Sequence, residues 1–359
     1  MRILEQKRLV RATFLALLAA GCATQNKTGK PSYSFYPPPP DPPRLQFLTA
    51  FSSEKEFRGG EEQSLMTFLT GAKPAEKSFG KPYGGAANDK KFFVCDTEMS
   101  AVLALDLQTR HFAALDTQGE GALKLPLNIT FDAEGNSYIV DAGREQVVIL
   151  DKNKSYVAAI GKAREMKPRD VAVNRDRIYV ADLMKHNVHV FDKASRNLLF
   201  DIPSPADSTN RTRGLFTPTN LALDSKSRLY VSDSGAFRVQ VYDAEGKYVR
   251  SIGELGDHLG QFARVKGVAV DRNDRLYAVD AMSQVTQIFD ADGHLLTWFG
   301  EPETGIKIQN LPAKVFLDYE DVSFFQRYAA PGFQVEHLVV IINQLGPHKV
   351  SVYGFGHKK

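Results

Sequence analysis

A repeated pattern of short apolar runs constrains this chain more than any other feature. The stretch "RLYVSDSGAFRVQVYDAEGKYVRSIG" (228–253) returns as "RLYAVDAMSQVTQIFDADGHLLTWFG" (275–300) and as "NSYIVDAGREQVVILDKNKSYVAAIG" (136–161). Weaker copies occupy residues 91–115 and 176–200, and a degenerate sixth copy covers 337–356. A chain of such repeats folds as units that bury their faces against their neighbours.

Each copy consists of runs in which apolar and polar residues alternate, which is typical of half-buried β-strands. Another short run precedes each copy, at 81–89, 125–133, 167–175, 217–225 and 264–272, and for the sixth copy we expect it at 319–327. Four strands in a unit of about 45 residues indicate a propeller blade. The sequence therefore predicts an all-β, six-bladed β-propeller with four-stranded antiparallel blades. Residues 44–51 match a fourth strand, so we expect this N-terminal strand to close the last blade.

The run "TPTNLALDSKSRLYVSDSGAFRVQVYDAEGKYVRSIGE" (217–254) resembles the NHL repeat nearly throughout, and the likeness extends over about residues 45–356. The approach "YPPPPDPPRLQFLTAF" and the closing "NQLGPHKVSVYGFG" are similar to exported bacterial NHL-repeat lipoproteins. This resemblance implies a six-bladed NHL-type ring in the cell envelope. Because similar proteins are often found beside multihaem cytochromes, it also implies a supporting role in an electron-transfer assembly.

The N-terminus has the pattern of an export signal. A basic stretch precedes the apolar run "ATFLALLAA", which is too short to span a bilayer. The sequence "AAGC" (19–22) resembles a bacterial lipobox, which implies lipidation of Cys22 and an outer-membrane location, on the periplasmic face or the cell surface. We therefore expect a signal peptide at 1–21, a lipidated, proline-rich tether at 22–43, and the propeller at 44–359.

Charge and cysteine usage narrow the function classes further. Residues 22–359 contain equal numbers of basic and acidic residues, so bulk charge gives no argument for nucleic acid, and export excludes it from our expected partners. If Cys22 carries lipid, Cys95 has no internal disulfide partner, and its setting "FFVCD" indicates a buried thiol. No histidine falls at the start of an inner strand, so no zinc constellation is readable.

The repeated aspartates have an architectural explanation. Each occurs where a strand ends and a turn begins, where an Asp side chain accepts backbone N–H groups. A catalytic carboxylate is needed once or twice in a site, not once in every blade. We therefore expect a structural role for these residues, which are Asp96, Asp141, Asp182, Asp233 and Asp280.

A candidate ligand site lies at the starts of the inner strands, which line the central channel. Two residues after the proline or its equivalent come Gly84, Asn128, Asp170, Asn220, Gly267 and, in the expected sixth strand, Asp321. Oxygen ligands of this kind suit Ca²⁺. Gluconolactonase-like propellers, which this arrangement resembles, hold a metal with Glu, Asn and Asp. We expect no cofactor, with Ca²⁺ at Asn128, Asp170, Asn220 and Asp321 as the open alternative.

Basic residues gather at the same strand starts and predict a cationic face. The candidate binding residues are Arg164, Lys167, Arg169, Arg211, Arg213, Arg264 and Lys266, with Lys81 and Lys124 nearby. Such a face suits an acidic envelope protein, a multihaem cytochrome among them, or an anionic envelope polymer. A solvated loop surface is the alternative.

Two insertions interrupt the repeats. Residues 52–80 contain "EEQSLMTFLTG", which predicts a short amphipathic helix, and residues 301–336 enlarge the last blade. These insertions could serve a partner or simply pack on the ring. We expect a monomeric, non-catalytic binding or scaffolding lipoprotein; the alternative is a metal-dependent hydrolase or lyase with a cation at the channel mouth.

Overall fold

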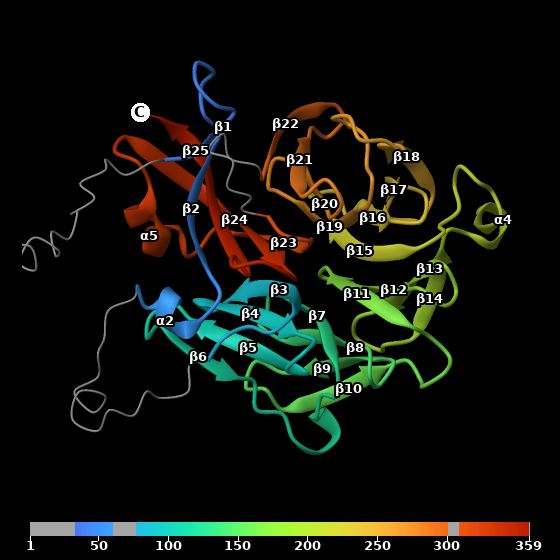
Figure 1. Ribbon diagram of the computed structural model, residues 1–359. Helices are drawn as coiled ribbons and strands as arrows, with labels where there is room; N and C mark the ends of the chain where they lie inside the picture. The colour runs from blue at the N-terminus through green and yellow to red at the C-terminus, as the bar shows by residue number, and fades with distance from the viewer. Residues whose placement is uncertain (1–32, 60–76, 301–308, 359) are drawn as a thin grey trace, which may run out of the picture. The chain divides into compact units, whose positions relative to one another are not determined.

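The computed structural model describes residues 33–59, 77–300 and 309–358, and within them six antiparallel sheets surround a central axis (Figure 1). The first residue of each inner strand pairs with the last residue of the second strand of its blade, as Pro218 does with Asp233. The inner strands are β3 (Pro82–Asn88), β7 (Pro126–Phe131), β11 (Pro168–Val173), β15 (Pro218–Leu223), β19 (Val265–Val270) and β23 (Pro312–Asp318). This arrangement confirms the predicted six-bladed β-propeller. We call the side on which these strands begin the start face, and the opposite side the end face.

The remaining strands complete the blades outward from the axis. They are β4 (Lys91–Asp96), β5 (Ala101–Asp106), β6 (His111–Ala114), β8 (Ser137–Asp141), β9 (Gln146–Leu150), β10 (Tyr156–Ile160), β12 (Arg177–Asp182), β13 (Asn187–Asp192), β14 (Leu198–Ile202), β16 (Leu229–Asp233), β17 (Arg238–Tyr242), β18 (Tyr248–Ile252), β20 (Leu276–Asp280), β21 (Val285–Phe289), β22 (Leu295–Phe299), β24 (Phe333–Asn343) and β25 (Val350–Lys358). The second strand of each blade is the most deeply buried. In four of the blades this strand contains a tyrosine that is almost inaccessible and packs between neighbouring blades: Tyr138, Tyr179, Tyr230 and Tyr277.

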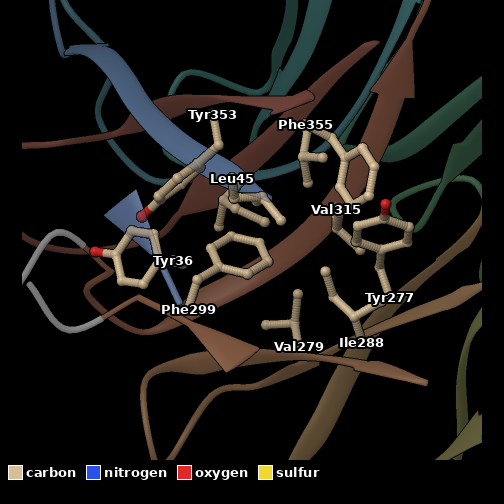
Figure 2. Packing of buried hydrophobic residues seen from close by; sticks show 11 residues of the cluster. Tyr36, Leu45, Tyr277, Val279, Ile288, Phe299, Val315, Tyr353 and Phe355 are labelled. Atoms are coloured by element: carbon tan, nitrogen blue, oxygen red, sulfur yellow. The ribbon is translucent and has the colours of Figure 1, made fainter. Parts of the chain in front are cut away.

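Strands from the N-terminal part of the described chain and from its C-terminal part together form the last blade. Its strand order is β1 (Phe35–Tyr36), β2 (Leu45–Phe51), β25, β24 and β23. Figure 2 shows Tyr36, Leu45 and Tyr353 of this blade packed around Phe299 of the preceding blade. The ring closes in the way predicted from residues 44–51. The blade also includes β1, so part of the expected 22–43 tether belongs to it.

The inner strand of the sixth blade is not where the sequence analysis placed it. Residues 319–327 begin after β23 has ended, and they contain the helices α5 (Val322–Phe325) and η2 (Gln326–Tyr328). Phe325 is buried and stacks on Phe92 of the first blade, with ring centroids 5.6 Å apart. The aromatic cluster at 324–333 therefore packs between blades, where an alternating strand had been expected.

Three other short helices lie in connections, namely α2 (Glu54–Phe57), η1 (Gly119–Gly121) and α4 (Pro205–Ser208). The helix expected within 61–71, the signal peptide and Cys22 lie outside the described residues. In the described part of the chain, no helix has the length and apolar character needed to cross a membrane.

The closing strand should contribute strongly to stability. Leu45 is fully buried between the fifth and sixth blades, so Leu45→Ala should lower the free energy of unfolding by about 2–5 kcal/mol. Val157→Ala, at a half-exposed position of the outer strand β10, is the control and should cost much less. Urea denaturation measures both. Equal losses would show that closure by β2 adds no more than an outer strand.

Candidate functional site

The repeated aspartates all accept backbone hydrogen bonds on the start face. In the second blade, Asp141 accepts from the N–H groups of Lys124, Leu125, Gly143 and Arg144 at 2.6–3.0 Å. These bonds join the residues that lead into the inner strand to the turn after the second strand. Bonds to the lead-in residues recur at Asp96, Asp182, Asp233 and Asp280. In the sixth blade the side chain of Asn343 accepts from the N–H of Asn310.

Six residues at equivalent positions line the channel near the start face. They are Gly84, Asn128, Asp170, Asn220, Gly267 and Lys314, each two residues after the first residue of its inner strand. Asp321 is not among them, because it follows the end of β23 on the end face. Sequence reasoning missed Lys314, although "LPAKVFLD" (311–318) matches "LPLNITFD" (125–132) closely enough to have located the strand.

Lys314 forms an ion pair across the channel. Its Nζ lies 2.6 Å from Oδ2 of Asp170, which belongs to the opposite blade. The same oxygen accepts from Asn220 Nδ2 and from the N–H of Leu221, and Oδ1 accepts from the N–H of Val171. Asp170 is completely buried, so this carboxylate is neutralised and saturated with donors inside the protein.

The ring around this pair is tightly closed. A Cβ built on Gly84 would lie 2.1 Å from Asn128 Oδ1, and one built on Gly267 would lie 2.7 Å from Lys314 Cα. Glycine is therefore required at both positions because neighbouring blades approach so closely. These two glycines, predicted as channel residues, provide space and no ligand.

The donor set does not fit Ca²⁺, which takes six to eight oxygen ligands. Asp170 is the one carboxylate of the six-residue ring, and the Lys314 ammonium occupies the cation position beside it. The buried Oδ1 atoms of Asn128 and Asn220 accept no hydrogen bond from the described residues, but two amide oxygens and one carboxylate fall short of the six to eight oxygen ligands of Ca²⁺. The residues of this ring therefore do not support a calcium-assisted reaction step.

Above this pair, at the channel mouth, the basic residues meet. We call Lys81, Arg169, Arg264 and Lys266, together with Tyr83, the mouth cluster. The ammonium of Lys266 lies 5.1 Å from the centroid of the Tyr83 ring. Burial lowers the pKa of Lys266 to about 8, and the charges of Arg264, Arg169 and Lys81 act in the same direction. The four cations are therefore close enough to repel one another.

The mouth cluster contains no acidic partner. Among the described residues, the side chains of these four cations make no hydrogen bond and no ion pair, although Lys266 is only 8% exposed. Burial of an unpaired ammonium costs free energy. A group of mutually repelling cations at a channel mouth is typical of a site that binds an anion.

The other predicted basic residues lie away from this cluster. Arg213 forms an ion pair with Asp207 at 3.3 Å, and Arg211 belongs to the same connection between the third and fourth blades. Arg164 and Lys167 are exposed in the connection before β11. The structure thus brings three of the predicted residues, Arg169, Arg264 and Lys266, together with Lys81 and Tyr83. The other four predicted residues are surface cations: Arg164, Lys167, Arg211 and Arg213.

Exposed apolar side chains occur in the turns and connections of the same face. Of the large hydrophobic residues that are most exposed, seven lie in start-face turns and connections, with exposures of 44–65%: Met99, Met184, Phe216, Leu255, Leu259, Met282 and Leu345. Methionine and aromatic side chains are enriched at protein interfaces, and four of these seven residues are Met or Phe.

Comparison with known proteins shows the same fold. A family model described as a 6-bladed beta-propeller matches residues 214–311. A probable peptidyl-alpha-hydroxyglycine alpha-amidating lyase, pgal-1 of Caenorhabditis elegans, is 29% identical over 181 residues, which are 47% of this chain and 49% of the relative. The chain therefore spans about half the length of this curated relative.

Two solved structures extend the comparison. A gluconolactonase from Xanthomonas campestris superposes with a TM-score of 0.55 at 16% identity, over 91% of this chain and 98% of that one. A chain of the nidogen/laminin complex superposes with a TM-score of 0.51 at 15% identity, over 77% and 94%. At these identities the likeness shows a six-bladed β-propeller.

Asp233 should act on stability and not on binding. Its Oδ1 accepts from the N–H groups of Phe216 and Thr217 at 3.0 and 2.7 Å in a buried setting. Asp233→Ala should therefore lower the free energy of unfolding by about 1–3 kcal/mol. Asp243→Ala, which removes similar bonds in an exposed turn, should cost less. Denaturant titration of both variants gives the comparison, and a neutral Asp233→Ala would contradict the architectural role.

The channel ion pair should behave as a coupled unit. Lys314→Met leaves the Asp170 carboxylate buried without its cation and should cost about 3–5 kcal/mol, whereas the double variant Asp170→Asn/Lys314→Met should recover most of this loss. Single-variant losses below about 1 kcal/mol would be those of a surface pair and would contradict this account.

In the same unfolding experiment, CaCl₂ and a chelator should leave the wild-type midpoint unchanged, and a stabilisation by calcium would show that the site does bind it.

Proposed function

We propose that the start face is a binding site for an acidic segment of a protein partner, with carboxylate or phosphate groups entering the mouth cluster. The observation that supports this proposal most strongly is the convergence of Lys81, Arg169, Arg264 and Lys266 without an acidic partner among the described residues. An anion that enters the mouth would relieve the repulsion between these cations and form charge-assisted hydrogen bonds with them.

The surroundings of the mouth favour a protein over an anionic polymer. Methionine and aromatic side chains are enriched at protein interfaces, and Met99, Met184, Met282 and Phe216 are exposed on the start face. A polysaccharide or polyphosphate would use the charges and leave these apolar side chains in water. An acidic segment with interspersed apolar residues uses both.

The wider biological setting of this proposal rests on the resemblance to exported NHL-repeat lipoproteins. The proposal includes three properties of the protein: NHL-type repeats, lipidation at Cys22 and attachment to the outer membrane. Attachment there would present the start face to envelope proteins with acidic surfaces, and a multihaem cytochrome is one such partner. Metabolic labelling with a fatty-acid analogue, comparing the wild type with Cys22→Ser, tests the anchor. Equal labelling of the two would remove it from the proposal.

A second candidate function is metal-independent catalysis at the same mouth. The related proteins include an amidating lyase and a gluconolactonase by name, and an amine with a pKa of about 8, such as that of Lys266, can exchange protons near neutral pH. Turnover of glucono-lactone or of a peptidyl-α-hydroxyglycine in the presence of a chelator, lost in Lys266→Met, would support this function. Absence of turnover leaves binding as the activity.

Charge reversal at the mouth tests the binding proposal. The double variant Arg169→Glu/Arg264→Glu should bind a fluorescent peptide of alternating Glu and Leu at least about tenfold more weakly than the wild type, because it places repulsive charges beside the anion. Arg211→Glu/Arg213→Glu makes the same change in net charge away from the mouth and is the matched control. Fluorescence anisotropy measures both affinities.

Three results would contradict the proposal in different ways. Equal weakening by the control would show a diffuse electrostatic surface, and no weakening by either variant would exclude the basic face. Saturable binding of polyphosphate with no binding of the peptide would replace the protein partner with an anionic polymer.

Lys266 should separate binding from stability. Lys266→Met removes a buried unpaired charge, so the free energy of unfolding at pH 7 should rise while anion affinity falls. Because burial depresses the pKa of this lysine, its destabilising effect is complete below about pH 8 and declines as the pH rises from there toward the ordinary lysine pKa of about 10.4. Wild-type peptide affinity should fall over the same range. Thermal unfolding and anisotropy between pH 6 and 10 measure this; a destabilised Lys266→Met would contradict it.

A further inference from the structure

A buried histidine in the third blade is held between two carboxylates. His189 lies on β13 and is only 5% exposed. Its Nδ1 lies 2.6 Å from Oδ1 of Asp201, the direct cross-strand neighbour on the outer strand β14. Its Nε2 lies 3.1 Å from Oδ2 of Asp182, the last residue of the second strand β12. Both ring nitrogens therefore face acceptor oxygens.

This arrangement requires the charged form of the imidazole. A neutral imidazole donates from one nitrogen and accepts at the other, so it can satisfy only one of the two carboxylates. The imidazolium donates from both nitrogens and forms two charge-assisted hydrogen bonds. Burial lowers the pKa of His189, but the hydrogen bonds to Asp182 and Asp201 outweigh burial, and the net shift of this pKa is upward.

The fold itself does not need a titratable group at this position. Gln240 and Gln287 are the equivalent residues of the fourth and fifth blades, because each faces the residue two places before the turn aspartate, as His189 does. Gln240 Nε2 donates to the carbonyl of Thr212 at 2.7 Å, and Gln287 Nε2 donates to that of Gln261 at 2.8 Å. An uncharged amide thus suffices there, whereas the third blade has a link whose strength depends on a proton.

The two carboxylates belong to different parts of the third blade. Oδ1 of Asp182 accepts from the N–H groups of Lys167 and Met184 at 2.8 Å, so this residue fixes both the lead-in to the inner strand and the start-face turn. Asp201 lies on β14, which pairs on one side only within the described part of the chain. The imidazolium of His189 therefore connects the outermost strand to the turn that positions the inner strand.

We propose that His189 is a protonation-dependent clamp of the third blade. As an imidazolium it holds β14 to the start-face turn after β12, and loss of its proton releases one carboxylate and loosens β14. Asp201 is the carboxylate that is released, because its side chain is 37% exposed and water can solvate it, whereas Asp182 is completely buried. The clamp is independent of the proposed function.

The elements packed around His189 contribute few other charges. β12 contributes Asp182 and β14 contributes Asp201, and on β13 itself the Phe191 ring lies 6.0 Å from the imidazole between centroids. The connection before β11 contains four exposed charged residues that form no hydrogen bond or ion pair with His189: Lys162, Arg164, Glu165 and Lys167. The protonation of His189 therefore depends mainly on the two aspartates.

NMR titration of the His189 imidazole, assigned with His189→Gln, tests the protonation step. Its pKa should lie above the ordinary histidine value of about 6.5. Asp201→Asn should lower this pKa, because one of the two anions becomes neutral. Asp192→Asn, which neutralises an exposed carboxylate at the far end of β13, is the matched control and should leave it unchanged. A His189 pKa at or below the ordinary value would overturn the proposal.

Urea denaturation between pH 6 and pH 9 tests the contribution to stability. Because the folded-state pKa of His189 is raised, its contribution is complete below about pH 6.5 and is lost as the pH rises through the folded-state value. The wild-type midpoint should therefore fall over this range by more than that of His189→Gln, which cannot titrate and should fold because Gln occupies this position in two other blades. Equal pH dependence of the two proteins would contradict the clamp.

His294→Gln is the matched control for this experiment. It removes an exposed histidine that pairs with Asp290, and it should retain the pH dependence of the wild type. If His294→Gln loses the same pH dependence as His189→Gln, the effect is one of general surface charge and the clamp is excluded.

Hydrogen exchange tests whether β14 loosens. Between pH 6 and pH 9, and after correction for the intrinsic rate, peptides covering β14 should exchange about tenfold or more faster relative to peptides covering β18, the outer strand of the fourth blade. The reason is that opening of β14 no longer breaks a hydrogen bond to a charged group. This relative acceleration should be absent in His189→Gln. Titration of His189 without acceleration in β14 would overturn the proposal.

Discussion

The ion pair between Lys314 and Asp170 determines the electrostatic character of the channel. It joins the sixth blade to the third across the axis, and it supplies the positive charge that the ring's carboxylate requires. Asp170 is the one carboxylate of the channel ring, and Lys314 already neutralises it. The channel ring therefore has no further carboxylate to neutralise the cations of the mouth cluster.

The mouth cluster lies where the repeats depart from their own pattern. At most equivalent positions the side chains satisfy each other, as the turn aspartates do with backbone N–H groups. Lys266 on the start face is a buried charge without a counter-ion among the described residues. Such local conflicts cost stability and mark sites where a ligand can complete the charge balance.

The ring could be predicted from the sequence because its strands repeat in both spacing and alternation. Five inner strands and the closure by residues 44–51 follow from patterns that are local and present in several copies. The sixth inner strand was misplaced because the copy is worn and the segment after it is rich in aromatic residues. These pack as the short helices α5 and η2 between blades. That error placed Asp321 in the channel and concealed Lys314.

The mouth cluster could be predicted in part. Basic residues at strand starts are visible in the sequence, but the separation of Arg169, Arg264 and Lys266 from Arg211 and Arg213 requires the positions of loops around the ring. The absence of a counter-ion among the described residues is likewise a property of the folded state. It depends on which carboxylates are already engaged, as Asp170 is with Lys314.

Direct titration of Lys266 tests the central claim, that the mouth carries an unpaired cation awaiting an anion. NMR of the lysine side-chain resonances, assigned with Lys266→Met, measures its pKa with and without the acidic peptide. The account predicts a pKa of about 8 in the free protein and an increase when the peptide is bound. A value near the ordinary lysine pKa of about 10.4, unchanged by the peptide, would contradict it.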